Sequence, residues 1–172
     1  VKQVRHNKII YVVGRKGSGK SHLVKTSLIP KFHRVYICDP NAEYILDGAH
    51  IFTDLDVLLD WLKESPEDYV VICRFDDDLE YKLLFRWVYQ LGNCSIVMEE
   101  MNFYVEIFLR TEDEDFKRLT RYSRHRSVNI IGICQRAADT PKLFTSQCDT
   151  FISFVQSEPR DLDYIADRFG DA

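Results

Sequence analysis

Residues 8–21 read KIIYVVGRKGSGKS, and this stretch decides the fold. An apolar, β-forming run over residues 8–13 passes directly into GRKGSGKS, which satisfies the pattern GxxxxGK[ST] at every fixed position. A helical pattern over residues 21–28 follows and ends at Pro30. A strand, a glycine-rich turn and a helix in this order predict a phosphate-binding loop. Its backbone N–H groups point inward, and the helix N-terminus adds the positive end of its dipole.

The loop predicts ATP and Mg²⁺ as cofactors. Lys20 is expected to reach the β- and γ-phosphates, and the Ser21 hydroxyl is expected to ligate Mg²⁺. The alternative is a glycine-rich turn that binds nothing. The residues predicted to contact the nucleotide are Gly14, Arg15, Lys16, Gly17, Ser18, Gly19, Lys20, Ser21 and His22.

Apolar runs alternate with helical patterns along the rest of the chain. Strands that are apolar on both faces and separated by helices predict a parallel sheet covered on both sides. We therefore expect an α/β fold, a three-layer P-loop NTPase sandwich with a mostly parallel sheet, as one domain over residues 1–172. The predicted strands are 8–13, 34–38, 69–73, 95–98, 129–134 and 150–154; the predicted helices are 21–28, 55–62, 79–91 and 159–169, with a mainly helical stretch over 104–124.

Composition excludes several classes of protein. The chain has 172 residues, 45% apolar and 29% charged, which is typical of one globular domain and not of a disordered chain. Its longest run without a charged residue, 87–98, has 12 residues, whereas a membrane-spanning helix needs about 18. We therefore expect no membrane span.

Cysteine, histidine and charge patterns bear on disulfides, metal sites and nucleic-acid binding. The five cysteines form no CxxC pair and the five histidines are scattered, so neither a disulfide framework nor a zinc site is expected. Buried free thiols in a reducing cytoplasm fit better. The net charge of −4 argues against a protein coated for nucleic acid, although residues 118–126 (RLTRYSRHR) form a local basic segment.

Two carboxylates follow the apolar run SIVM of residues 95–98. Glu99 is expected to support Mg²⁺, and Glu100 is expected to orient and deprotonate the attacking water as a general base. The usual pattern is Asp then Glu, so Glu99 is one methylene longer than usual. A rival acid, Asp76, comes three residues after the run YVVIC, too late to lie at the tip of a strand.

A glutamine and several arginines complete the candidate set. Gln135 directly follows the run of residues 129–134, and it would face the γ-phosphate if that strand lies beside the phosphate-loop strand. The alternative is an exposed amide at a strand end. One arginine of the basic segment would serve as a finger in trans, because a finger needs a planar, permanently charged guanidinium. The others are expected to contact DNA phosphates or to be surface charge.

With these residues in view, the chain resembles the FtsK–HerA superfamily of DNA-pumping ATPases. Besides the phosphate loop, the resemblance rests on DPNAEY at residues 39–44, which is similar to the family's "DP..EY", and on the strand that ends in Glu99-Glu100. The run GICQR, followed by TPK at residues 140–142, is similar to the family's glutamine-bearing segment. Together these stretches span residues 8–168.

The resemblance implies a ring, commonly hexameric or otherwise pentameric, that threads double-stranded DNA through its centre. It implies that Gln135 senses the γ-phosphate and that the finger lies near the start of the glutamine strand, at Arg124 or Arg126. The viral genome-packaging branch includes motors as small as this chain. That branch would work in the host cytoplasm or on the virion, docked on a capsid portal or vertex protein.

Two other classes of function stay open from sequence. A monomeric P-loop phosphotransferase, such as a small-molecule kinase, would need an arginine-rich lid, which residues 118–126 could imitate. A non-catalytic nucleotide-binding scaffold would be indifferent to Glu100→Gln.

Overall fold

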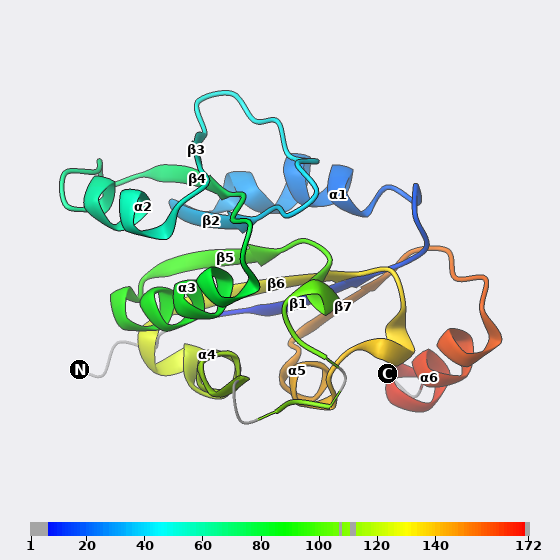
Figure 1. Cartoon of the computed structure of the whole chain (residues 1–172). Coiled ribbons are helices and arrows are strands. Elements are labelled where there is room, and N and C mark those ends of the chain that lie inside the picture. Colours follow the sequence, from blue (N-terminus) through cyan, green and yellow to red (C-terminus); the bar gives the residue numbers. More distant parts are fainter. Residues whose placement is uncertain (1–6, 107, 111–112, 171–172) are drawn as a thin grey trace, which may run out of the picture.

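The chain forms one sheet, described by a computed structural model of residues 7–106, 108–110 and 113–170 (Figure 1). The strands run in the order β3-β4-β2-β5-β6-β1-β7, and every pairing is parallel. With helices on both faces, this confirms the predicted α/β class. The strands are β1 (Ile9–Val13), β2 (Arg34–Cys38), β3 (His50–Phe52), β4 (Tyr69–Cys73), β5 (Cys94–Met98), β6 (Val128–Cys134) and β7 (Thr150–Ser153).

Helices cover the two faces unequally. One face carries α1 (Lys20–Leu23), which continues as a π-helical turn (Val24–Leu28) and a 3₁₀ turn (Ile29–Lys31). The other face carries the longer helices (Figure 1). These are α2 (Leu55–Leu62), α3 (Asp78–Leu91), α4 (Glu114–Arg126) and α5 (Lys142–Gln147), with α6 (Pro159–Phe169) beside the end of the sheet.

Alternation along each strand builds two apolar cores. In β1, Tyr11 and Val13 join the cluster beneath α2–α5, whereas Ile10 and Val12 join the cluster beneath α1. Successive side chains of a strand point to opposite faces, so a strand buried on both faces must be apolar throughout. This explains the continuous apolar runs of the sequence.

Local signals set several helix starts. The Asp54 carboxylate accepts a hydrogen bond from the Val57 N–H at 3.0 Å and caps α2. Asp77 likewise accepts from the Leu79 N–H at 2.9 Å and caps α3. Such caps satisfy N–H groups that have no partner inside the helix. Pro159, with its fixed φ, opens α6 as predicted.

The prediction of a mainly helical stretch over residues 104–124 is wrong in its first half. Among the described residues, α4 begins at Glu114 and the chain before it is irregular. Tyr104 and Val105 are buried there, so they gave an apolar signal without a helix. Asp113 shapes the end of this segment, just before α4, by accepting the Arg110 N–H at 2.8 Å.

Two elements carry no usable sequence signal. Strand β3 has three residues and α5 has six, too few for an apolar period to be recognised. The thiol prediction is confirmed: five cysteines are free, and four of them are buried (Cys38, Cys73, Cys94 and Cys134).

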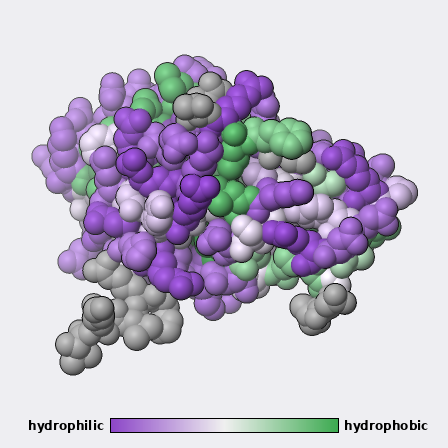
Figure 2. Space-filling view, turned by 90° about the horizontal axis from the view of Figure 1, so that it is seen from below, coloured by the Kyte–Doolittle hydropathy of each residue, from purple (hydrophilic) through white to green (hydrophobic). Residues whose placement is uncertain are grey.

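The face on the side of α4–α6 is largely polar. Figure 2 views the molecule from the side of α4–α6 and shows mostly hydrophilic residues, interrupted near the middle by an apolar strip. Within the described residues, no helix combines the length and the apolar character needed to cross a membrane.

Removing the Phe144 ring is expected to destabilise the fold by about 3–5 kcal/mol. The ring is fully buried, meets Tyr11 edge-on at 5.9 Å between centroids, and packs where a Cβ on Gly132 would lie 2.6 Å from it. Urea denaturation of Phe144→Ala measures the loss. Ile45→Ala is the matched control, because its side chain is 86% exposed and its loss should stay within about 0.5 kcal/mol. Equal midpoints for the two variants would mean that α5 lies outside the cooperative core.

Candidate functional site

The predicted site residues gather at the carboxyl end of the sheet, around a pocket of about 330 Å³. Strands β1, β6 and β5 lie side by side, so the segments that follow them meet there. The pocket is lined by Lys16, Gly17, Ser18, Gly19, Lys20, Ser21, His22, Glu43, Glu99, Glu100 and Gln135. Of the predicted nucleotide contacts, Gly14 and Arg15 do not line the pocket.

The phosphate loop is held by its own lysine. The Lys20 ammonium is buried and donates to the carbonyl oxygens of Gly14 at 2.7 Å and Arg15 at 3.2 Å. Gly17 and Gly19 have φ of 74° and 100°, a left-handed backbone that glycine adopts without steric cost. The Ser18 hydroxyl oxygen is buried and has no hydrogen-bond partner among the described residues. The loop therefore retains an unpaired buried donor for a ligand oxygen.

Glu99 and Ser21 come together beside the loop. Glu99 is 1% exposed, and the Ser21 Oγ lies 3.3 Å from each of its carboxylate oxygens. Burial raises the pKa of Glu99, and a hydrogen bond from the Tyr44 hydroxyl at 2.7 Å opposes that rise. A hydroxyl and a carboxylate are hard oxygen ligands of the kind that Mg²⁺ prefers, so these two residues fit a Mg²⁺ site. The rival acid Asp76 is exposed and does not line this pocket.

Glu100 and Gln135 form the opposite wall. Strand β6 pairs with β1 on one side and β5 on the other, as the placement of Gln135 beside the phosphate loop requires. The Gln135 amide donates to the Glu100 carboxylate at 2.5 Å. Glu100 itself has φ 51° and ψ 59°, a left-handed conformation that is unfavourable for a side chain with a Cβ. Such strained positions cluster at functional sites, where the surrounding structure holds them.

The DPNAEY motif, to which the sequence analysis assigned no structural role, contributes to the pocket. Asp39 is fully buried and accepts the N–H groups of Glu43 at 2.8 Å and Tyr44 at 3.0 Å. Arg74, which follows β4, donates to Asp39 at 3.1 Å and to the Tyr44 carbonyl at 2.7 Å. The acid thus folds the loop back so that Tyr44 reaches Glu99. The motif spacing was a usable signal for Tyr44, but nothing local pointed to Arg74.

The two finger candidates lie at the other end of the molecule. Arg124 and Arg126 end α4, just before the amino end of β6, whereas Gln135 follows its carboxyl end. The strand has 7 residues, so it separates the two ends by about 23 Å. Neither arginine therefore reaches the pocket of its own chain.

Arg124 and Arg126 have different environments. The Arg126 guanidinium donates to the carbonyl oxygens of Tyr89, at 3.0 Å, and Gln90 near the end of α3. Arg124 is exposed, and its guanidinium has no hydrogen bond or ion pair with the rest of the described chain.

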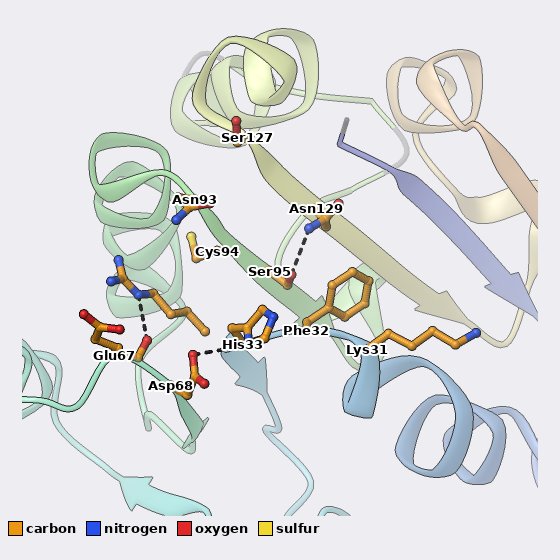
Figure 3. Close-up of a pocket in the computed structure, with 11 residues that line it drawn as sticks. Lys31, Phe32, His33, Glu67, Asp68, Asn93, Cys94, Ser95, Ser127 and Asn129 are labelled. Carbon is orange, nitrogen blue, oxygen red and sulfur yellow. Dashed lines mark hydrogen bonds and ion pairs between the residues drawn. The ribbon is translucent and has the colours of Figure 1, made fainter. Parts of the chain in front are cut away.

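A second cavity, of about 580 Å³, lies at the amino ends of β2, β5 and β6 (Figure 3). Several of its polar side chains already have partners. His33 pairs with Asp68 at 3.3 Å, Arg34 donates to the Glu67 carbonyl at 3.0 Å, and Asn129 donates to the Ser95 hydroxyl at 3.1 Å. None of the motif residues lines it, so the carboxyl-end pocket is the candidate active site.

Comparison with known proteins gives a result at the level of structure. No protein-family model matches the chain, and no curated protein matches it. The genome packaging NTPase B204 of Sulfolobus turreted icosahedral virus 2, solved in complex with ATP-gammaS, is similar with a TM-score of 0.75 and 22% identity, over 96% of this chain and 83% of that chain. The N-terminal domain of zonular occludens toxin from Neisseria meningitidis is similar with a TM-score of 0.54 and 12% identity, over 88% of this chain and 78% of that one.

The cytoplasmic domain of EssC is also similar, with a TM-score of 0.54 and 14% identity, over 95% of this chain and 34% of that one. At these identities the likeness concerns the fold. The chain therefore has an α/β P-loop NTPase fold, which it shares with the viral genome packaging NTPase B204.

Proposed function

We propose that this chain is an ATPase that moves double-stranded DNA, working as a viral genome-packaging motor of the FtsK–HerA superfamily. One observation carries the proposal. A phosphate loop, a hydroxyl–carboxylate pair, a second carboxylate and an amide converge on one pocket, and each has the chemistry that phosphoryl transfer to water needs. These groups are Lys20, Ser21, Glu99, Glu100 and Gln135.

In the proposed reaction the loop cradles the phosphates of ATP. Lys20 turns from the loop carbonyls toward the β- and γ-phosphates, where its charge offsets the charge of the transition state. Glu100 accepts the proton of the attacking water. Gln135, which already donates to Glu100, would contact the γ-phosphate and that water through its amide.

The metal site is proposed on Ser21 and Glu99. Bound Mg²⁺ would neutralise charge on the β- and γ-phosphate oxygens. The Ser21 hydroxyl would ligate the ion, and Glu99 would support it directly or through water.

The proposed homo-oligomeric ring, hexameric or pentameric, is supported by the placement of the arginines if one of them is a finger. The pocket lies at the carboxyl end of the sheet and Arg124 at the amino end of β6, so only another copy can bring that arginine to the pocket. A contact between two different surfaces of the same chain is heterologous, and such contacts form a ring when the rotation between copies closes. Arg124 is the better finger because the donors of Arg126 are already used on Tyr89 and Gln90.

DNA contact is proposed for exposed arginines of α4. A motor that moves any sequence needs contacts with backbone phosphates and not with bases. Arg118 and Arg121 are exposed on this helix and suit that role. The proposed setting is the host cytoplasm or the virion, with a capsid portal or vertex protein as the docking partner.

The phosphotransferase alternative is less well supported. Such an enzyme needs a basic lid over the nucleotide, but no residue of 118–126 lines the pocket, and the end of this segment precedes the far end of β6. The DPNAEY loop, which that alternative leaves without a role, here forms part of the pocket wall through Glu43.

Steady-state ATP hydrolysis with and without linear double-stranded DNA tests the proposal. We expect DNA to stimulate hydrolysis, and we expect Lys20→Ala to lower the stimulated rate by about 10²–10³, the typical effect of losing one electrostatic donor to the transition state. Hydrolysis that ignores DNA would contradict a translocase. Phosphate transfer to a small acceptor in that case would establish the transferase alternative.

A further inference from the structure

We infer that Tyr44 is a positioning residue for the Mg²⁺ site: its hydroxyl fixes the Glu99 carboxylate beside the Ser21 hydroxyl, and these two residues would hold the ion. The inference rests on the proposed function, because it assigns a role in the same pocket. Tyr44 does not line the pocket itself and is not placed in contact with the nucleotide.

The contact is direct and buried. Tyr44 is 0% exposed, and its hydroxyl donates to the Oε2 of Glu99 at 2.7 Å. The remaining hydrogen-bond partner of that carboxylate among the described residues is the Ser21 hydroxyl, at 3.3 Å. A buried carboxylate that receives one strong neutral donor and one long contact has an oxygen left for a cation.

The tyrosine is held from three directions. Asp39 accepts the backbone N–H of Tyr44, and Arg74 donates to its carbonyl oxygen. From the helix that follows the phosphate loop, the Lys25 ammonium lies 4.6 Å from the centre of the Tyr44 ring and also donates to the Glu43 carbonyl at 2.6 Å. The ring is therefore tied both to the motif loop and to the helix that carries Ser21. Asp39 and Arg74 thus fix the backbone of Tyr44, and Lys25 packs on its ring.

Glu99 needs such a partner for two physical reasons. A glutamate has one more rotatable bond than the aspartate usual at this place, so more rotamer freedom must be lost to present its carboxylate. The carboxylates of Glu100 and Glu43 also act on it electrostatically, and the charge of Lys20 opposes them. Groups that orient a metal ligand in this way typically change metal affinity or activity by about 10–100-fold when removed.

Tyr44→Phe tests the inference, because it removes the hydroxyl and keeps the ring. We expect the concentration of Mg²⁺ that half-saturates binding of a fluorescent ATP analogue to rise by about 10–100-fold. Binding of the same analogue in EDTA should stay unchanged. The matched control is Tyr36→Phe, which removes an equally buried hydroxyl that pairs with the Tyr69 hydroxyl at 2.5 Å and does not line the pocket. The control should leave both binding constants unchanged.

A double-mutant cycle with Glu99→Gln separates positioning from general damage. If Tyr44 acts through Glu99, Tyr44→Phe should cause almost no further rise in the half-saturating Mg²⁺ concentration when Glu99 is already replaced by Gln. An unchanged Mg²⁺ requirement in Tyr44→Phe would overturn the inference. An equal loss of affinity for the analogue with Mg²⁺ and in EDTA would also overturn it. If instead the wild-type chain binds the analogue no better than Lys20→Ala and without regard to Mg²⁺, the proposed function itself is wrong and the inference falls with it.

Discussion

Arg124→Ala is expected to lower the rate of DNA-stimulated ATP hydrolysis by about 10³–10⁵, the range typical of arginine fingers. The guanidinium is exposed and unpaired within the described chain, and it lies at the opposite end of β6 from Gln135, so it can act only on the pocket of a neighbouring copy. Arg126→Ala is the matched control. Its guanidinium binds Tyr89 and Gln90 within the chain, so the expected loss is in stability and not in rate.

Mixing two inactive variants tests whether the finger acts in trans. Arg124→Ala keeps an intact pocket, and Lys20→Ala keeps an intact finger. In a mixed ring, some interfaces join the good pocket of one variant to the good arginine of the other, so activity should reappear on mixing. An Arg124→Ala protein that stays as active as wild type, or a pair of inactive variants that stays inactive when mixed into rings, would contradict this assignment.

Glu100→Gln is expected to lower hydrolysis by about 10²–10⁴, the usual contribution of a general base, while ATP still binds. The amide keeps the size of the side chain and its place beside Gln135, but it cannot accept a proton from water. Single-turnover hydrolysis measures the chemical step, and binding of a fluorescent ATP analogue measures affinity. Loss of binding together with hydrolysis would mean that Glu100 shapes the pocket and does not act as a base.

Asp76→Asn is the matched control for the base. This exposed carboxylate was the rival acid in the sequence and does not line the pocket. Its variant should hydrolyse ATP at the wild-type rate. A scaffold that binds nucleotide without hydrolysing it would be indifferent to both substitutions.

Much of the fold was predictable because its signals are local. The β-forming runs, the caps at Asp54 and Asp77, and Pro159 at the start of α6 each act within a few residues. Where the local signal was ambiguous, the prediction failed. Tyr104 and Val105 are large hydrophobic residues that are buried in an irregular segment, because burial does not require a helix.

The candidate site also combines features that are local in the sequence with features that depend on the sheet. The glycine spacing of the phosphate loop and the paired acids after β5 are contiguous patterns, so the sequence by itself was enough to predict a nucleotide site at the ends of these strands. Which strands are neighbours is a property of the sheet. The order β5-β6-β1 brings Gln135 between the loop and Glu100, and no single segment encodes that order.

Only the tertiary structure decided the partners of each site residue. Tyr44 and Glu99 are 55 residues apart, and Arg74 and Asp39 are 35 apart, yet both pairs are in hydrogen-bond contact. The same holds for the arginines: Arg124 and Arg126 are two residues apart and chemically identical, but only Arg126 meets the carbonyl oxygens at the end of α3. Spacing along the chain specifies residue types, whereas burial and hydrogen-bond geometry in the folded sheet decide which of them are free to act.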